Sequence, residues 1–456
     1  MAEKINEREI VLDLLLDMEK NGSYTHLLLR TTLKKYQFVD KKSRAFITKL
    51  LEGTTEYRIQ LDYILDQFSK TKMKKCRPLV RNLLRMSVYQ ICYLEHIPDS
   101  AVCNEAVRLA KKRGFSSLSG FINGVLRNIS RNKEKISFPD EKKNPVFSLS
   151  IKYSMPEWLI WMWLSEYSYD IVEKMLASTL KERGTVVRVN QQKTTKEELK
   201  KELEQEMWVR DGEYLPFSLV LTQYDYLQKN LAFLDGKFQV QDESSMLVAV
   251  IANPKQDDFV VDVCAAPGGK SLHMAELLQD GGKVLSRDLT EDKVELIEDN
   301  IERMGYKNIE TEVFDALKLD ESLIGRADIV IADLPCSGLG VMAKKNDLKY
   351  RITREDIREL SALQREILGI VSQYVKPGGT LIYSTCTVTR EENIENYRWI
   401  KEKLEFESRS FWEQLPKELR TETAKEGYLQ LLPGVHSCDG FFISSFRKNL
   451  KEDSSN

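Results

Sequence analysis

The sequence is poor in the residues that build metal centres and disulfide frameworks. Its 456 residues include only four histidines and seven cysteines. No His-Glu-x-x-His or Cys-x-x-Cys spacing occurs, and the cysteines are scattered along the chain. These absences count against a histidine-bound catalytic metal, a zinc ribbon and a disulfide scaffold. We therefore expect free thiols and no metal.

Long apolar segments are also lacking. No run approaches the ~20 residues that a helix needs to cross a bilayer. The first residues, MAEKINEREIVLDLLL, place acids as well as bases before apolar residues at helical spacing, and no small-residue cleavage site follows. This start is typical of a folded helix and not of a signal peptide. We expect a cytoplasmic protein with no membrane partner, and a monomer.

The charge is small overall but unevenly distributed. The formal net charge is −2, yet residues 1–145 carry 28 Lys and Arg against 17 Asp and Glu, and the remainder is correspondingly acidic. A basic first third indicates a polyanionic partner such as nucleic acid. An ordinary solvated helical surface would have the same composition, and charge alone does not decide between the two.

The hydrophobic pattern changes along the chain and divides it into three parts. In residues 1–135 apolar residues recur every three or four positions, which predicts an all-helical domain. Residues 130–145 carry two prolines and many charges and mark a hinge. Between 184 and 235 strand-like and helical segments alternate. The predicted domains are residues 1–140, 145–240 (a small α+β subdomain) and 241–450.

From about residue 255 strands and helices alternate regularly. The pattern predicts strands at 258–263, 283–288, 308–313, 327–333 and 378–385, and helices at 271–280, 291–305 and 354–375. This alternation is typical of a parallel sheet covered by helices on both faces, an α/β Rossmann-like fold. Ligands of such folds bind beyond the carboxyl ends of the strands. The residues that follow each strand are therefore the functional candidates.

The segment after the first of these strands is rich in small residues. It reads Cys264-Ala-Ala-Pro-Gly-Gly-Lys270-Ser271 and opens a helix, so backbone N–H groups can approach a ligand closely. A phosphate-binding loop has the pattern Gly-x-x-x-x-Gly-Lys-Ser/Thr, which this segment satisfies except that Cys264 replaces the first glycine. A P-loop nucleotide hydrolase is thus one alternative.

Acidic residues after the next strands favour a different ligand. Asp288 ends the second strand about 20 residues beyond the glycines, where an acid hydrogen-bonds the ribose hydroxyls of an adenosine-type ligand. Asp315 follows the third strand, where a carboxylate can accept from the adenine amine. An acidic lining repels a triphosphate but suits the cationic sulfonium and amine of S-adenosylmethionine. Strand-end turn formation is the simpler alternative for either acid.

Two cysteines and an acid follow the last two strands. The fourth strand ends at Asp333, with Cys336 three residues later, and the fifth is followed by Cys386. A lone strand-end cysteine is usually a small buried apolar residue. Two such cysteines beside one crevice favour a function, but their spacing does not say how they divide the work.

Methylation of cytosine at carbon 5 is a reaction that needs sulfur. Carbon 5 is a poor nucleophile until a thiolate adds to carbon 6, after which it takes the methyl group, a base removes its proton and the thiolate leaves. The attacking thiol should therefore have a pKa below the usual value of about 8.5. Asp333 is placed to hold N3 and the exocyclic amine of the base. An N-methyltransferase would carry an Asn/Asp-Pro-Pro-Tyr/Phe tetrad in place of Asp-Leu-Pro-Cys.

Four segments together resemble the Sun-type RNA 5-methylcytosine methyltransferases: VDVCAAPGGKS, IADLPCSGLG, YSTCT and DGFFIS. This resemblance covers about residues 235–447. It implies that Cys386 is the nucleophile, that Cys336 assists product release, and that Asp333 takes part in both catalysis and cofactor binding. It also implies a cofactor site for S-adenosyl-L-methionine made of Asp288, Asp315, Asp333 and the loop residues Cys264, Ala265, Ala266, Pro267, Gly268, Gly269 and Lys270.

The helical first part resembles the NusB family through NEAVRLAK (104–111) and FINGVLRN (121–128). A NusB-like domain joined to a Sun-type domain implies RNA as partner, namely cytosine 967 of 16S rRNA, either free or in an assembling small subunit. Two other functions are alternatives, a P-loop nucleotide hydrolase and a non-catalytic RNA-binding protein. The second is disfavoured because both cysteines and all three acids are present.

Overall fold

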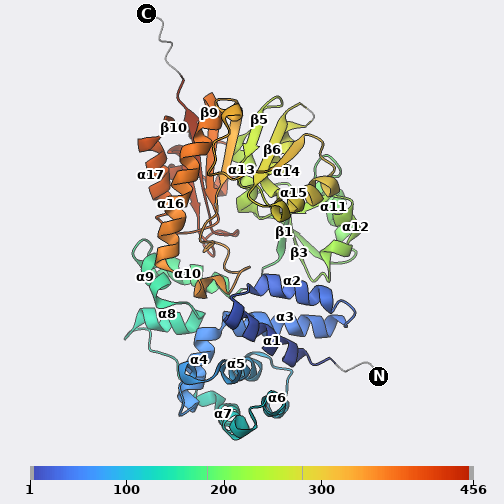
Figure 1. The fold of residues 1–456 in the computed structure, drawn as a ribbon, viewed down its shortest axis with the longest axis vertical. Coiled ribbons are helices and arrows are strands. Elements are labelled where there is room, and N and C mark those ends of the chain that lie inside the picture. The colour runs from blue at the N-terminus through green and yellow to red at the C-terminus, as the bar shows by residue number, and fades with distance from the viewer. Residues whose placement is uncertain (1–4, 182, 280, 451–456) are drawn as a thin grey trace, which may run out of the picture. The chain divides into compact units, whose positions relative to one another are not determined.

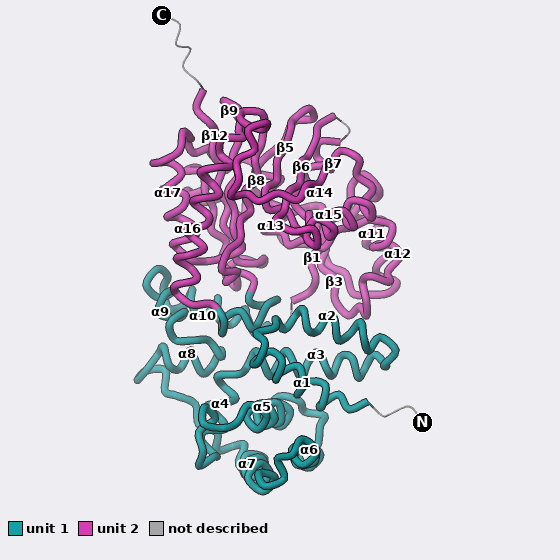
Figure 2. Tube along the Cα trace, in the orientation of Figure 1, with its two compact units in different colours: residues 1–181, 342–351 teal, residues 182–341, 352–456 magenta. Residues whose placement is uncertain are grey.

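The computed structural model describes residues 5–181, 183–279 and 281–450. The chain forms two compact units (Figure 2). Unit 1 comprises residues 1–181 together with 342–351, and unit 2 comprises residues 182–341 and 352–456. Among the described residues no helix is both long and apolar enough to cross a membrane.

Unit 1 is helical, as its periodicity predicts (Figure 1). Leu12, Leu50 and Leu84 are fully buried in its core. Local signals mark the helix ends: Asn6 caps the first helix, Gly22 ends it in the left-handed conformation, and Pro78 begins another helix at a position where its missing N–H costs nothing. The helices are α1 (Glu7–Asn21), α2 (Thr25–Lys35), α3 (Lys41–Glu56), α4 (Arg58–Phe68), α5 (Pro78–Tyr93), α6 (Asp99–Lys112), α7 (Ser119–Arg131), α8 (Pro145–Tyr153), α9 (Glu157–Leu164) and α10 (Tyr169–Thr179).

Residues 342–351 interrupt the sequence of unit 2 and pack within unit 1. Lys349 is fully buried and forms an ion pair with Glu56 at the end of α3. The Tyr350 hydroxyl donates to the backbone oxygen of Glu56 at 2.8 Å, and the Asn346 side chain donates to the backbone oxygen of Glu52 at 3.0 Å. No periodic pattern in the sequence indicates that residues 342–351 belong to unit 1. The domain boundaries predicted from the sequence stay a prediction.

Unit 2 begins with the small α+β region that the sequence predicts. Four antiparallel strands pair in the order β2-β3-β1-β4: β1 (Thr185–Val189), β2 (Trp208–Asp211), β3 (Ser218–Thr222) and β4 (Phe238–Val240). The accompanying helices are α11 (Lys196–Leu203) and α12 (Leu231–Leu234). Helix α13 (Glu243–Ala252) follows and packs mainly against the larger sheet. The capping box of α11 forms between Thr195 and Glu198.

A larger sheet occupies the rest of unit 2, in the order β10-β12-β9-β8-β5-β6-β7. Its strands are β5 (Phe259–Asp262), β6 (Lys283–Asp288), β7 (Ile309–Val313), β8 (Ala327–Asp333), β9 (Val375–Thr385), β10 (Phe406–Ser408), β11 (Tyr428–Leu431) and β12 (Phe441–Lys448). Its helices are α14 (Gly269–Leu278), α15 (Glu291–Met304), α16 (Arg354–Val371), α17 (Ile394–Lys403) and α18 (Glu422–Lys425).

The five predicted strands β5 to β9 pair in parallel, which confirms the Rossmann-like prediction. The sheet as a whole is mixed, because β12 pairs antiparallel with β9, β10 and β11. Both faces are buried: Val260 and Ile329 face one core, whereas Val261 and Val330, their neighbours along the strands, face the other. The strand order reverses between β5 and β8, so their carboxyl ends border the crevice where ligands of this fold bind.

Candidate active site

The loop of residues 264–270 links β5 to α14, and a residue at the end of β6 holds the middle of this loop. The Asp288 carboxylate, nearly buried at the end of β6, accepts from the Ala266 amide at 2.9 Å. Gly268 has φ +95°, and a Cβ there would lie 3.2 Å from the Ile297 side chain of α15. The loop therefore needs glycine at this position, and the first amides of α14 remain directed at the crevice.

The remaining acid of the predicted cofactor set lies in a local turn. Asp315 follows β7, and its carboxylate accepts from the Leu317 amide at 3.0 Å. The second oxygen of Asp288 accepts from the Leu289 amide at 2.8 Å and from Lys293 Nζ at 2.9 Å. Asp288 is therefore both a turn former and a strand-end carboxylate, and the two interpretations do not exclude each other.

A buried acid that the sequence patterns did not single out lies beneath the loop. Asp262, at the end of β5, has no exposed surface and accepts a hydrogen bond from the Ser271 hydroxyl at 2.7 Å. Burial raises the pKa of Asp262 to about 7, and the nearby charges of Asp333 and Asp288 add to the rise. An acid at the end of an otherwise apolar strand is the signal that could have found it.

Lys270 is directed at an acid from another strand. Its Nζ lies 2.6 Å from Asp333 Oδ2, and the Ser384 hydroxyl donates to Asp333 Oδ1 at 2.7 Å. Burial lowers the pKa of Lys270, but Asp333, Asp262 and Cys386 raise it, and the net direction is upward. A lysine held by a carboxylate in this way is not presented to a phosphate, which counts against the P-loop alternative.

The two candidate cysteines meet in space. Cys336 Sγ lies 3.2 Å from Cys386 Sγ, although 50 residues separate them in sequence. The hydrogen bond to Cys386 and then burial raise the pKa of Cys336 well above its usual value. Two thiols this close do not both ionise readily. Cys264 lies in the loop between β5 and α14. Burial and the charge of Asp288 raise the pKa of its thiol strongly.

A buried glutamate that the sequence analysis missed braces both cysteine loops. Glu392 is fully buried and accepts from the Ser337 amide at 2.8 Å and the Ser337 hydroxyl at 2.5 Å. The same hydroxyl lies 2.7 Å from that of Thr387, the neighbour of Cys386. Thr389 and Gln364 also donate to Glu392, at 2.7 and 3.1 Å. A glutamate in a loop has no periodic signal, so only the fold reveals this role.

Two glycines bring a fourth segment to the site. A Cβ on Gly340 would lie 1.9 Å from the backbone oxygen of Gly440, so the two backbones touch. The Gly440 amide donates to Gly340 O at 2.9 Å, and the Gly340 amide donates to Cys386 O at 3.0 Å. The DGFFIS segment, which contains Gly440, thereby fixes the backbone that carries Cys386.

The predicted site residues thus converge at the carboxyl ends of β5, β6, β8 and β9, with Asp315 after β7 at the edge. Within the described residues no group of three or more His, Cys, Asp or Glu is arranged to hold a metal. A glycine-rich loop and strand-end acids at the carboxyl edge of a Rossmann-like sheet are typical of proteins that bind an adenosine-containing cofactor.

Comparison with known proteins narrows this class. Residues 249–447 match 16S rRNA methyltransferase RsmB/F, residues 5–131 the NusB family, and residues 155–225 the ferredoxin-like domain of RsmF/B-like methyltransferases. The chain belongs to the 16S rRNA methyltransferase RsmB/F family. These matches confirm the predicted fold class and the resemblance to the Sun-type and NusB families.

Several relatives match the chain over nearly its whole length. The chain is 40% identical to the probable ribosomal RNA small subunit methyltransferase B of Bacillus subtilis strain 168, over 98% of this chain and 99% of that protein. It is 32% identical to the protein of the same description from Synechocystis, over 97% and 100%. The crystal structure of PH0851 superposes with a TM-score of 0.80 at 27% identity, covering 98% of this chain and all of that one.

Proposed function

We propose that this protein methylates carbon 5 of a cytosine in 16S rRNA through a covalent bond between Cys386 Sγ and carbon 6 of the base. The observation that carries the proposal is the pair of sulfur atoms 3.2 Å apart, next to the Lys270–Asp333 ion pair. Two thiols beside a cofactor crevice have no use in methylation of a nitrogen, which attacks through its own lone pair.

The cofactor we propose is S-adenosyl-L-methionine, which supplies an electrophilic methyl group when bound. The loop from Cys264 to Lys270 packs against Ile297 of α15 because Gly268 lacks a side chain, and its small residues leave the backbone open to a ligand. Asp288 and Asp315 carry carboxylates at the ends of neighbouring strands, as an adenosine moiety requires. Asp333, whose carboxylate is paired with Lys270, completes the strand-end acids at the end of β8, so the donor set fits this cofactor.

The division of labour between the thiols is proposed from the resemblance to the Sun-type family and is supported by the charged groups around them. Cys386 attacks carbon 6 as a thiolate, and Lys270, whose cationic form the surrounding acids favour, stabilises that anion. The electron pair moves to carbon 5, where the new bond to the methyl group forms. Asp333, backed by Ser384 and Lys270, holds N3 and the exocyclic amine of the cytosine during this step.

Product release falls to Cys336. Its pKa is raised by the neighbouring Cys386, and this cause disappears once Cys386 is bound to carbon 6. Cys336 then gives its proton to water and, as a thiolate, takes the proton from carbon 5. The electrons of that C–H bond form the double bond between carbons 5 and 6, and the carbon–sulfur bond breaks with its electrons returning to Cys386. The base is left as 5-methylcytosine and the proton on Cys336.

The RNA substrate is proposed from the relatives, which are described as methyltransferases of small-subunit ribosomal RNA. Within 16S rRNA we propose cytosine 967 as the target, presented free or in an assembling subunit, and the cytoplasm as the compartment. Bisulfite sequencing of rRNA from a strain that lacks the gene, before and after incubation with the purified enzyme, identifies the modified position.

Cysteine variants test the mechanism directly. Cys386→Ala should lose methylation while still binding S-adenosylmethionine in calorimetry. Cys336→Ala should accumulate a protein–RNA adduct that survives a denaturing gel, since release is blocked. Cys76→Ala, a partly buried cysteine of unit 1, is the matched control and should behave as wild type. Methylation by Cys386→Ala, or the absence of a shifted band with Cys336→Ala, would contradict the assignment.

A further inference from the structure

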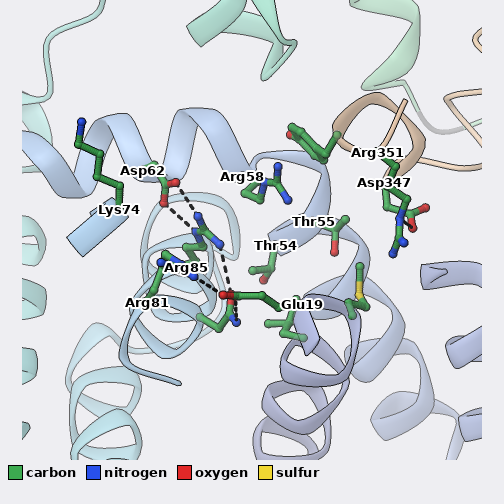
Figure 3. A pocket seen from close by; sticks show the side chains of 14 residues that line it. Glu19, Thr54, Thr55, Arg58, Asp62, Lys74, Arg81, Arg85, Asp347 and Arg351 are labelled. Atoms are coloured by element: carbon green, nitrogen blue, oxygen red, sulfur yellow. Dashed lines mark hydrogen bonds and ion pairs between the residues drawn. The ribbon is translucent and has the colours of Figure 1, made fainter. Parts of the chain in front are cut away.

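Unit 1 contains a cavity that the proposed reaction does not use. Its volume is about 500 Å³, and residues from α1, α3, α4, α5 and the 342–351 segment line it (Figure 3). Ligand pockets of ~300–1,000 Å³ commonly hold molecules of nucleotide size. Its charged lining consists of five cationic residues (Arg58, Lys74, Arg81, Arg85 and Arg351) and three acidic ones (Glu19, Asp62 and Asp347).

Three of the five cations are already neutralised by the three acids. Arg85 donates twice to Asp62, at 2.7 and 2.6 Å, and Arg81 pairs with Glu19. Arg351 Nε lies 2.8 Å from Asp347 Oδ2. The cavity therefore has two positive charges in excess, and they belong to the remaining cations, Arg58 and Lys74.

Arg58 and Lys74 have no carboxylate or hydrogen-bond partner among the described residues, and Figure 3 draws both without one. The Arg58 guanidinium lies over the Tyr350 ring, 3.8 Å from its centroid. Tyr350 is itself fixed, because its hydroxyl is 2.8 Å from Glu56 O and 3.0 Å from Ser154 O. Tyr350 therefore covers one face of the Arg58 guanidinium, whose N–H groups have no acceptor in the described part of the chain.

An unpartnered acceptor lines the same cavity. Asp347 is 2% exposed. Its Oδ2 accepts from the Thr25 amide at 3.2 Å and from Arg351, whereas its Oδ1 is buried without a hydrogen-bond partner in the described part of the chain. A buried carboxylate oxygen without a donor is costly, so it indicates a ligand that brings an N–H or O–H group.

We propose that this cavity binds one nucleotide of the RNA substrate. The phosphate lies against the Arg58 guanidinium while Lys74 adds a second positive charge to the lining, the base stacks on that guanidinium, and an amine or hydroxyl of the nucleotide donates to Asp347 Oδ1. Stacking on arginine and recognition of hydroxyl and amine edges are common in single-stranded RNA binding. A bare anion or an acidic peptide fits less well, because Asp347 would repel it. The proposal rests on RNA being the substrate.

The test measures binding of a short fluorescein-labelled single-stranded RNA to the full-length protein, with S-adenosylhomocysteine present to occupy the candidate cofactor site. Arg58→Gln should weaken binding about tenfold, as expected for one lost charge-assisted hydrogen bond. The slope of log affinity against log salt should fall by about 0.7 for this variant and for Lys74→Gln. Arg58→Lys should keep the slope but lose affinity, because lysine does not stack. Arg131→Gln and Lys111→Gln, exposed residues of the same unit, are the controls.

Competition and crosslinking identify the ligand. Uridine 5′-monophosphate should displace the RNA better than uridine, inorganic phosphate or polyglutamate, and a 4-thiouridine RNA should crosslink to the peptide that contains Tyr350. Equal competition by phosphate or polyglutamate, or an Arg58→Gln variant that matches its control in affinity and slope, would overturn the proposal. Methylation is measured separately: an enzyme that fails to methylate cytosine while Arg58→Gln still weakens RNA binding refutes the proposed function and not this site.

Discussion

Glu392 offers a test of how the site is held together, because its four hydrogen bonds all come from groups other than the thiols of Cys336 and Cys386. Its carboxylate accepts four hydrogen bonds, two from Ser337 and one each from Thr389 and Gln364. Glu392→Ala would leave the buried Ser337 amide without an acceptor. One N–H of the Gln364 side chain would also lose its acceptor, while the other still donates to Pro335 O at 2.8 Å. At ~1–3 kcal/mol for each stranded donor, unit 2 should lose about 2–6 kcal/mol of stability.

Glu392→Gln is the milder change. The amide oxygen can still accept from the Ser337 amide and Gln364, and the hydroxyls of Ser337 and Thr389 can turn to accept from the new amine. The loss is then the difference between charged and neutral hydrogen bonds, about 1–3 kcal/mol. A cysteine loop displaced by ~1 Å loses on the order of a hundredfold in rate. We therefore expect kcat to fall strongly for alanine and moderately for glutamine, with the Kd for S-adenosylmethionine unchanged.

The assay combines urea unfolding, calorimetry with the cofactor and single-turnover methylation of rRNA. Glu402→Gln, an exposed glutamate on α17, is the matched control and should leave all three unchanged. A Glu392→Ala enzyme with the stability and kcat of this control would refute the idea that Glu392 braces the cysteine loops. A fall in cofactor affinity equal to the fall in kcat would assign the residue to general folding of the unit.

Two further predictions concern stability. Gly340→Ala should destabilise unit 2 by at least ~1–3 kcal/mol, because the added Cβ meets the backbone of Gly440. Gly369→Ala in α16 should instead stabilise the unit by ~0.5–1 kcal/mol, because nothing lies within 4 Å of the added Cβ. Unfolding midpoints that do not separate in this order would contradict the packing. The pKa of Asp262 is raised to about 7 from 3.8, so the folded protein favours the protonated acid. The stability of the wild type, relative to that of Asp262→Asn, should therefore fall as pH rises from about 4 to 7 and then level off. Parallel stability curves for the two proteins across that window would count against a raised pKa for Asp262.

Much of the architecture could be predicted from local pattern. The alternation of strands and helices from residue 258 to 385 and the helical character of residues 1–135 are both confirmed. Each depends on residues close in sequence, whose spacing reports which face of an element is buried. The same patterns located Asp288, Asp333, Cys336 and Cys386, because strand ends are where this fold holds its ligands.

The sequence alone determined which segments form strands and helices, and which side chains follow the strands. Only the tertiary structure decided that Lys270 meets Asp333 across 63 residues, that Glu392 braces the cysteine loops, and that residues 342–351 join unit 1. The physical reason is that hydrophobic periodicity records burial without naming the partner. Hydrogen bonds and ion pairs between distant segments depend on where the chain folds back, and they give Cys336 and Cys386 their different surroundings.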